Sequence, residues 1–153
     1  MLGHSEECRD NKVEVLSTRL KHREEKIQRV LECLIEEAAK GIPIIVEGKK
    51  DVRTLKTLDV QGKILSAKTG GKSRLDVVSE AEKTGTQNII LLLDFDRRGK
   101  ELTEKLRQDL EKVGMKPNLR FWNELFRLVR RDVKDVEGLA AYFDTLRKKI
   151  GEI

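Results

Sequence analysis

The stretch NIILLLDFDRRG, residues 88–99, decides how this sequence is interpreted. An apolar run, residues 89–93, leads directly into two acids, two arginines and a glycine: Asp94, Asp96, Arg97, Arg98 and Gly99. A short continuous apolar run predicts a strand that is buried on both faces, as in a parallel sheet. Carboxylates and guanidinium groups at the end of such a strand indicate a functional site whose position is fixed by the buried strand.

Three further segments have strand character, and helical segments alternate with them. The predicted strands are IPIIVEG (42–48), KILSAK (63–68), NIILLL (88–93) and NLRFW (118–122). Apolar residues at helical spacing predict helices over residues 22–40, 49–60, 72–85, 100–114, 124–131 and 136–149. Alternation of strands with helices predicts an α/β fold, with a four-stranded, mainly parallel, Rossmann-like sheet in one compact domain.

The length of 153 residues fits a single domain, and no repeat or linker divides the chain. We expect residues 1–40 to form an N-terminal extension and a packing helix, and residues 41–122 to form the core. Residues 123–153 are expected to be two C-terminal helices that pack on the same domain. Residues 1–20 have weak periodicity, so we expect them to be frayed or only partly helical.

The composition limits the classes of function. The net charge is +5, which favours a polyanionic partner such as nucleic acid, although a charge-rich surface alone would explain it. The cysteines and histidines, Cys8, Cys33, His4 and His22, form neither a zinc-binding pattern nor a disulfide framework. Apolar runs of five residues are too short to cross a bilayer, and no signal sequence precedes them, so we expect a soluble cytoplasmic protein without membrane contact.

Four acids follow two of the predicted strands. Glu47 ends the first strand, Asp51 lies one helical turn later, and Asp94 and Asp96 follow the third strand. If these strands are neighbours, the carboxylates share one edge of the sheet and repel each other unless a cation neutralises them. Mg²⁺ suits such oxygen ligands and supports phosphoryl transfer or phosphodiester cleavage. The alternative is that each acid only caps the helix after it.

These residues resemble the two motifs of the Toprim domain, which topoisomerases, bacterial primases, recombination and repair proteins, and ribosomal-RNA maturases share. The resemblance rests on Glu47-Gly48 with Asp51, and on Asp94-Phe95-Asp96 with Gly99. It covers residues 42 to about 122, with some likeness in DVEGL at 135–139, and is strongest to small stand-alone archaeal and bacterial Toprim proteins.

The resemblance implies roles for the acids. Glu47 would be a general acid/base or a metal-site acid, Asp51 an auxiliary catalytic acid, and Asp94 and Asp96 ligands of Mg²⁺, or alternatively Mn²⁺. The zinc module of primases is absent from the sequence. Tyr142 is the only tyrosine and lies on an apolar helix face, so we expect a core residue and not a topoisomerase nucleophile.

Several basic residues are candidates for binding phosphate or nucleic acid. Arg97 and Arg98 can form bidentate hydrogen bonds with phosphate. The loop KTGGKS, residues 68–73, lacks the first glycine of a Walker A motif but can present backbone amides with Lys72 and Ser73. The remaining candidates are Lys49 and a predicted basic helical face, whose alternative is a solvated surface: Arg127, Arg130, Arg131 and Lys134.

The sequence therefore predicts a magnesium-dependent Toprim-type protein that cleaves or joins phosphodiester bonds in RNA or DNA, in RNA processing or DNA repair, within a larger processing complex. One alternative is a non-catalytic nucleic-acid-binding module or adaptor. The other is a subunit whose charged helices dock a partner enzyme. RNA and DNA are not separated by the sequence.

Overall fold

A computed structural model describes the backbone of residues 2–152 and the side chains of residues 14–152. The elements in chain order are α1 (Leu2–Ala39), β1 (Ile44–Val46), α2 (Lys49–Thr57), β2 (Ile64–Ser66), the 3₁₀ turn η1 (Thr69–Gly71), α3 (Arg74–Lys83), β3 (Asn88–Leu91), α4 (Arg97–Lys112), β4 (Lys116–Asn118), α5 (Arg120–Val129) and α6 (Val136–Glu152). In this described part of the chain, no helix combines the length and apolar character needed to cross a membrane.

The four strands form one parallel sheet in the order β2-β1-β3-β4. In the register, Ile44 pairs with Ile64 on one side and with Ile90 on the other. The strands that precede the two acidic motifs, β1 and β3, are therefore neighbours at the centre of the sheet. The predicted α/β class with a parallel four-stranded sheet is confirmed.

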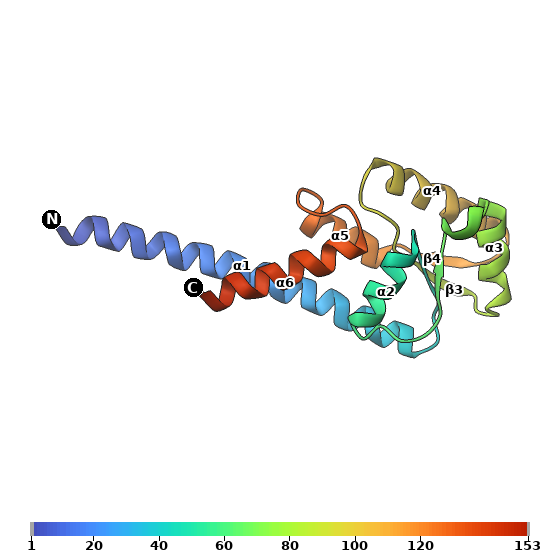
Figure 1. The fold of residues 1–153 in the computed structure, drawn as a ribbon, viewed down its shortest axis with the longest axis horizontal. Helices are drawn as coiled ribbons and strands as arrows, with labels where there is room; N and C mark the ends of the chain where they lie inside the picture. The colour runs from blue at the N-terminus through green and yellow to red at the C-terminus, as the bar shows by residue number, and fades with distance from the viewer. Residues whose placement is uncertain (1, 153) are drawn as a thin grey trace.

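Helices cover both faces of the sheet, and two apolar clusters hold the layers together. Ile44 and Ile90 face a cluster formed with α1, α2, α5 and α6, while Ile45 and Leu91 face a cluster formed with α3 and α4. Continuous apolar strands are needed because each face is covered. Figure 1 shows α1 running away from the sheet toward the N-terminus, with α6 alongside part of its length.

The first helix is longer than the sequence pattern predicts. We expected a helix over residues 22–40, but α1 is continuous from Leu2 to Ala39. No glycine or proline interrupts residues 4–40, so the backbone hydrogen bonds can continue although the apolar stripe weakens. Gly41, at φ 93°, then ends the helix in a left-handed conformation that glycine adopts easily.

The fourth strand and the fifth helix lie earlier than predicted. The prediction of a strand over residues 118–122 is wrong, because β4 is Lys116–Asn118 and α5 already begins at Arg120. Phe121 and Trp122 therefore belong to the buried face of α5 and not to a strand. Aromatic residues favour strands, and this local preference concealed the helical spacing that starts at Phe121.

The end of α5 corrects a second prediction. The helix ends at Val129, so only Arg127 of the predicted basic face is helical. The other three members, Arg130, Arg131 and Lys134, lie in the connection between α5 and α6 (residues 130–135). These residues are exposed, but they do not form one helical face.

Candidate active site

Acidic side chains gather in a hollow of about 380 Å³ at the carboxyl edge of β1 and β3. This is where ligands bind in parallel α/β sheets. The lining residues are Glu47, Gly48, Lys49, Lys50, Asp51, Arg53, Lys68, Asp94, Asp135 and Glu137. We call this hollow the acidic pocket. It brings together three of the four predicted acids, Glu47, Asp51 and Asp94.

Glu47 and Asp51 are the two buried acids of the pocket. Glu47 is 7% exposed, and its Oε2 accepts a hydrogen bond from Nζ of Lys68 at 3.2 Å. Its Oε1 is buried and has no hydrogen-bond donor among the described residues. A buried carboxylate oxygen without a donor is costly, so this atom is poised to accept a proton or bind a cation.

The pKa of Asp94 is shifted by its neighbours in the pocket. Burial, a side-chain hydrogen bond with Glu47, and the negative charges of Glu47, Asp51 and Asp135 raise the pKa of Asp94 to about 8. A shift of this size favours the protonated form of Asp94 beside the Glu47 carboxylate in the metal-free protein.

Asp51 is fixed by two backbone amides. Its Oδ2 accepts from the amide of Gly48 at 3.1 Å, and its Oδ1 accepts from the amide of Glu137 at 3.2 Å. Burial raises the pKa of Asp51, and these two hydrogen bonds oppose that shift. The bond to Glu137 joins the first turn of α2 to the first turn of α6.

Asp96 does not line the acidic pocket. Its Oδ1 accepts from the amide of Gly99 at 2.8 Å and caps α4, as the capping alternative predicted for a single acid. Gly99 is also constrained, because an added Cβ would lie 2.1 Å from the backbone oxygen of Asp94. The first turn of α4 thus packs directly against the backbone that carries Asp94.

Trp122 supports the same backbone from α5. Its Nε1 donates to the carbonyl oxygens of Leu93 and Asp94 at 2.9 and 3.2 Å. On the other side, the amide of Phe95 donates to the carbonyl oxygen of Lys134 at 2.5 Å. The end of β3 is therefore held by α4, α5 and the connection before α6.

Sequence reasoning assigned no site role to five of the lining residues: Lys50, Arg53, Lys68, Asp135 and Glu137. Lys68 follows β2, whose carboxyl end lies at the same edge as that of β1, and this position was the available signal. Asp135 lies directly before α6, where it accepts from the amide of Gly138 at 2.6 Å, and it also lines the pocket. Its place in the DVEGL segment was the signal for this second role.

Among the predicted phosphate-binding residues, Lys49 lines the acidic pocket. Arg97 is on the first turn of α4 and pairs with Glu101 at 3.2 Å, while Arg98 beside it is exposed. Lys72 donates to the carbonyl oxygen of Ser66 and to Glu80. Ser73 caps α3, with Asp76 as its reciprocal partner.

The donor chemistry of the pocket fits a hard divalent cation. Within residues 14–152, no three acidic, histidine or cysteine side chains are already arranged around a metal position, and the side chains of His4 and Cys8 lie outside the described residues. The metal-ligating groups of the pocket are nevertheless carboxylate oxygens, one of them the open Oε1 of Glu47, and four cationic side chains line the same pocket: Lys49, Lys50, Arg53 and Lys68. Mg²⁺ prefers oxygen donors and is commonly held by one or two carboxylates.

Comparisons with known proteins identify the family. The Toprim domain family model matches residues 42–123. A UPF0292 protein of Methanosarcina acetivorans is 37% identical over 127 residues, which cover 83% of this chain and 86% of that protein. A UPF0292 protein of Methanocaldococcus jannaschii is 37% identical over 119 residues, with 77% and 90% covered.

A solved structure has the same fold. A putative protein from Aquifex aeolicus superimposes with a TM-score of 0.60 at 25% identity, and the match covers 72% of this chain and 94% of the other. With the family model matching more than half of its length, the chain belongs to the Toprim family.

Proposed function

We propose that this protein is a magnesium-dependent enzyme that cleaves or transfers phosphodiester bonds in nucleic acid. Toprim domains generally act on nucleic acids with a bound metal ion. The observation that carries the proposal is the buried Oε1 of Glu47, which has no donor among the described residues and stands beside Asp94 with its raised pKa. Structural acids are usually paired, whereas perturbed, unpaired acids in a hollow are typical of functional sites.

A bound Mg²⁺ would polarise a phosphate oxygen and stabilise the leaving oxygen. Asp94 would hold it after losing its proton, and Glu47 would be a ligand only in the alternative in which its open oxygen binds the metal and does not act as a base. Asp96 is a further ligand in this proposal. Its Oδ1 is engaged by the amide of Gly99, and no hydrogen bond or ion pair from residues 14–152 engages its Oδ2.

The proton chemistry is assigned to Glu47 and Asp51. Glu47 has one carboxylate oxygen committed to Lys68 and one open oxygen, so it can accept a proton from an attacking hydroxyl or water. Asp51 is an auxiliary acid, and its backbone hydrogen bonds fix its orientation without involving Glu47.

Basic residues around the site would bind phosphate. Lys49 lies at the pocket, and Arg97 and Arg98 project from the first turn of the helix that follows Asp94. Lys72 and Ser73 stay in the proposal as weaker candidates, because both have intramolecular partners. The basic residues after α5, Arg127, Arg130, Arg131 and Lys134, are proposed to contact the nucleic-acid backbone.

One observation favours a second function. Lys68 already pairs with Glu47, and the described side chains hold no preformed three-ligand metal site. A protein with this pocket could bind nucleic acid as a non-catalytic adaptor in an RNA- or DNA-processing complex, with Lys68 neutralising Glu47 permanently. The two functions differ in whether the metal changes the nucleic acid.

The test is an incubation of the purified protein with labelled single- and double-stranded RNA and DNA in Mg²⁺, Mn²⁺ or chelator. We expect products only with metal, and a loss of about 10²–10⁴-fold in rate for Glu47→Gln, as for other general bases. Asp94→Asn should also inactivate. Asp144→Asn, at an exposed acid on α6, is the matched control and should be active.

Two results would contradict the enzymatic proposal. One is a turnover that Glu47→Gln leaves unchanged. The other is binding of nucleic acid that is identical in Mg²⁺ and chelator, with no product from any of the four substrates. The second result would support the adaptor function.

A further inference from the structure

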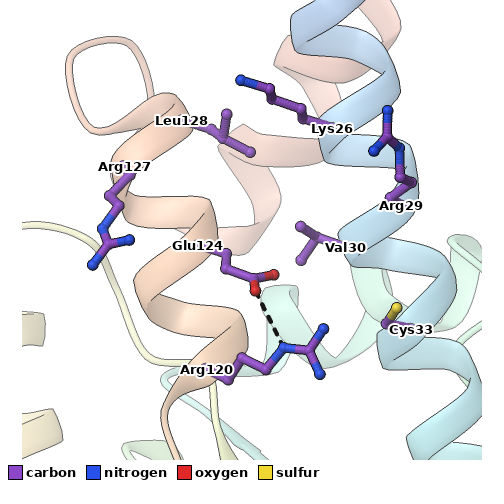
Figure 2. A pocket seen from close by; sticks show the side chains of 8 residues that line it. All are labelled: Lys26, Arg29, Val30, Cys33, Arg120, Glu124, Arg127 and Leu128. Atoms are coloured by element: carbon purple, nitrogen blue, oxygen red, sulfur yellow. Dashed lines mark hydrogen bonds and ion pairs between the residues drawn. The ribbon is translucent and has the colours of Figure 1, made fainter.

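A groove with basic walls lies between α1 and α5, on the helical layer that also contains α2 and α6. One hollow of the groove has a volume of about 470 Å³ and is lined by Lys26, Arg29, Val30, Cys33, Arg120, Glu124, Arg127 and Leu128. Figure 2 shows Lys26 reaching from α1 toward Leu128 of α5, and Arg120 reaching from α5 toward Cys33 of α1. The floor is apolar and the walls carry positive charge.

Two smaller hollows continue this groove. Arg127 and Leu128 line both of them and also the hollow of about 470 Å³. One extends along α1 and adds Arg19 and Arg23. The other extends over the connection after α5 and adds Arg130 and Arg131. We call the three hollows together the basic groove.

The basic groove contains the positive charge of the protein. Its lining includes eight lysines and arginines but only two carboxylates, those of Glu124 and Asp132. Its formal charge is therefore +6, compared with +5 for the whole chain, so the remaining 24 basic and 25 acidic residues almost cancel. Such concentration on one surface is the electrostatic footprint of a polyanion site.

Most cations of the groove are available to a ligand, whereas Arg23 and Arg120 pair with the two acids of the groove, Asp132 at 3.7 Å and Glu124 at 3.1 Å. No carboxylate of residues 14–152 lies within 4.0 Å of the charged nitrogens of Lys26, Arg127, Arg130 or Arg131. Arg29 has only a 4.0 Å contact with Glu25, and both side chains are largely exposed. If these cations had only a structural role, we would expect ion pairs for them, because the sequence contains many acidic residues.

A short segment of the chain links the basic groove to the acidic pocket. The connection that carries Arg130 and Arg131 is bonded to the Asp94 segment through the amide of Phe95 and the carbonyl oxygen of Lys134. Asp135, the next residue, lines the acidic pocket. One short segment therefore joins the basic groove to the acids.

We propose that the basic groove binds the phosphate backbone of a nucleic-acid strand and that α1 forms one wall of this binding site. This inference deepens the proposed function and rests on it for the identity of the polyanion. The helix from Arg19 to Arg29 rises about 15 Å. That length matches about four phosphates along one strand, at ~3.4 Å each.

The test compares two triple variants with the same change of charge. Lys26→Gln/Arg29→Gln/Arg127→Gln removes three cations of the groove. Lys83→Gln/Lys105→Gln/Lys112→Gln removes three exposed lysines from α3 and α4, on the opposite layer. Binding of labelled single- and double-stranded RNA and DNA is measured by fluorescence anisotropy, in chelator, between about 50 and 200 mM KCl. Labelled polyglutamate is a fifth probe.

We expect the groove variant to lose about tenfold or more in affinity for nucleic acid and its salt slope to fall by about 2, since each single-strand phosphate contact contributes ~0.7. The control variant should retain most of its affinity. The single variants Lys26→Gln and Arg127→Gln should each lower the slope by about 0.7. The strand types that respond identify the source of the phosphate backbone.

Several outcomes would overturn the inference. The first is a groove variant that binds nucleic acid like the wild type, and the second is a control variant that loses as much affinity as the groove variant. The third is polyglutamate that binds as tightly as nucleic acid and loses as much affinity in the groove variant, which would indicate an acidic protein partner. Glu47→Gln, measured in parallel, separates the two proposals. If the groove variant loses affinity but neither the wild type nor any variant shows turnover, only the proposed enzymatic function is contradicted. If the groove variant binds like the wild type and turnover depends on Glu47, only the proposed role of the basic groove is contradicted.

Discussion

Replacement of Gly99 by alanine tests the packing that holds Asp94. An alanine Cβ at this position would lie 2.1 Å from the backbone oxygen and 2.5 Å from the backbone carbon of Asp94. Ordinary contacts of a Cβ begin near 3.4 Å, so the first turn of α4 and the Asp94 segment would have to separate by about 1.3 Å. Both partners are backbone, and neither can rotate away.

Two opposing effects set the magnitude. Alanine favours the helical conformation over glycine by about 1 kcal/mol at most. Overpacking costs about 1–3 kcal/mol, and a clash with a backbone atom belongs at the upper end of that range. We therefore expect Gly99→Ala to lower the free energy of unfolding by about 1–2 kcal/mol. For a chain of this length this corresponds to a decrease in Tm of about 2–8 °C.

The assay is thermal and chemical denaturation of the metal-free protein, followed by titration with Mg²⁺. Gly151→Ala is the matched control, because Gly151 is also helical and a Cβ there would meet nothing within 4 Å. The control should be as stable as the wild type or slightly more stable. Gly99→Ala should also bind Mg²⁺ more weakly, since Asp94 is displaced. A Gly99→Ala protein with unchanged Tm and Mg²⁺ affinity would refute the reasoning.

Three further predictions follow from the same site. Lys68→Ala should increase the affinity for Mg²⁺ by about two- to fivefold in calorimetry, because it removes the half-exposed cation that pairs with Glu47, and an unchanged or weaker affinity would contradict this. The pKa of Asp94 is about 8 in the folded protein and 3.8 as its ordinary value, so the folded state keeps a proton that the unfolded state releases. Stability of the metal-free protein should therefore fall as pH rises from about 4 to about 8 and then level off, and Asp94→Asn should flatten this part of the pH profile in chelator. Trp122→Phe should cost about 1–3 kcal/mol in urea denaturation, because the carbonyl oxygens of Leu93 and Asp94 lose their donor, and a neutral effect would show that water replaces it.

The central strands were predictable because their sequence fits only strands that are buried on both faces. Residues 89–93 and 42–46 are apolar without a break, so both faces must be covered, and the helices between them enforce parallel pairing. The sequence left the neighbour relation of β1 and β3 as a condition, and the sheet order β2-β1-β3-β4 meets it. The positions of Glu47 and Asp94 at one edge are a consequence of that order.

The boundary between β4 and α5 was not predictable from local preference. Phe121 and Trp122 have high strand propensity, but the apolar contacts of β3 with α5 decide their conformation. Asn118 also reverses the chain, because its Oδ1 accepts from the amide of Arg120 at 2.9 Å. Such tertiary and side-chain contacts override propensities that amount to a fraction of 1 kcal/mol per residue.

The acidic site shows a similar division. The spacing predicted which acids share an edge, but it could not show that Asp96 turns back to cap α4 while Asp135 enters the pocket from a segment 41 residues after Asp94. The pairing of Lys68 with Glu47 depends on the side-chain conformation of an exposed lysine, which no periodicity encodes. Charge alone also did not reveal that α1 and α5 align their cations along one groove.

The hydrogen bond from the amide of Glu137 to Asp51 has a consequence for engineering this protein. It connects two residues that are 86 positions apart, and one of them lies beyond residue 123, where the family match ends. A fragment trimmed to the matched residues would keep both acidic motifs but would lose Asp135 and one of the two amides that fix Asp51. An exchange of the connection before α6, or a transfer of the matched residues alone into another protein, would therefore change the orientation of Asp51 and the set of acids in the pocket, although the exchanged residues lie outside the family match.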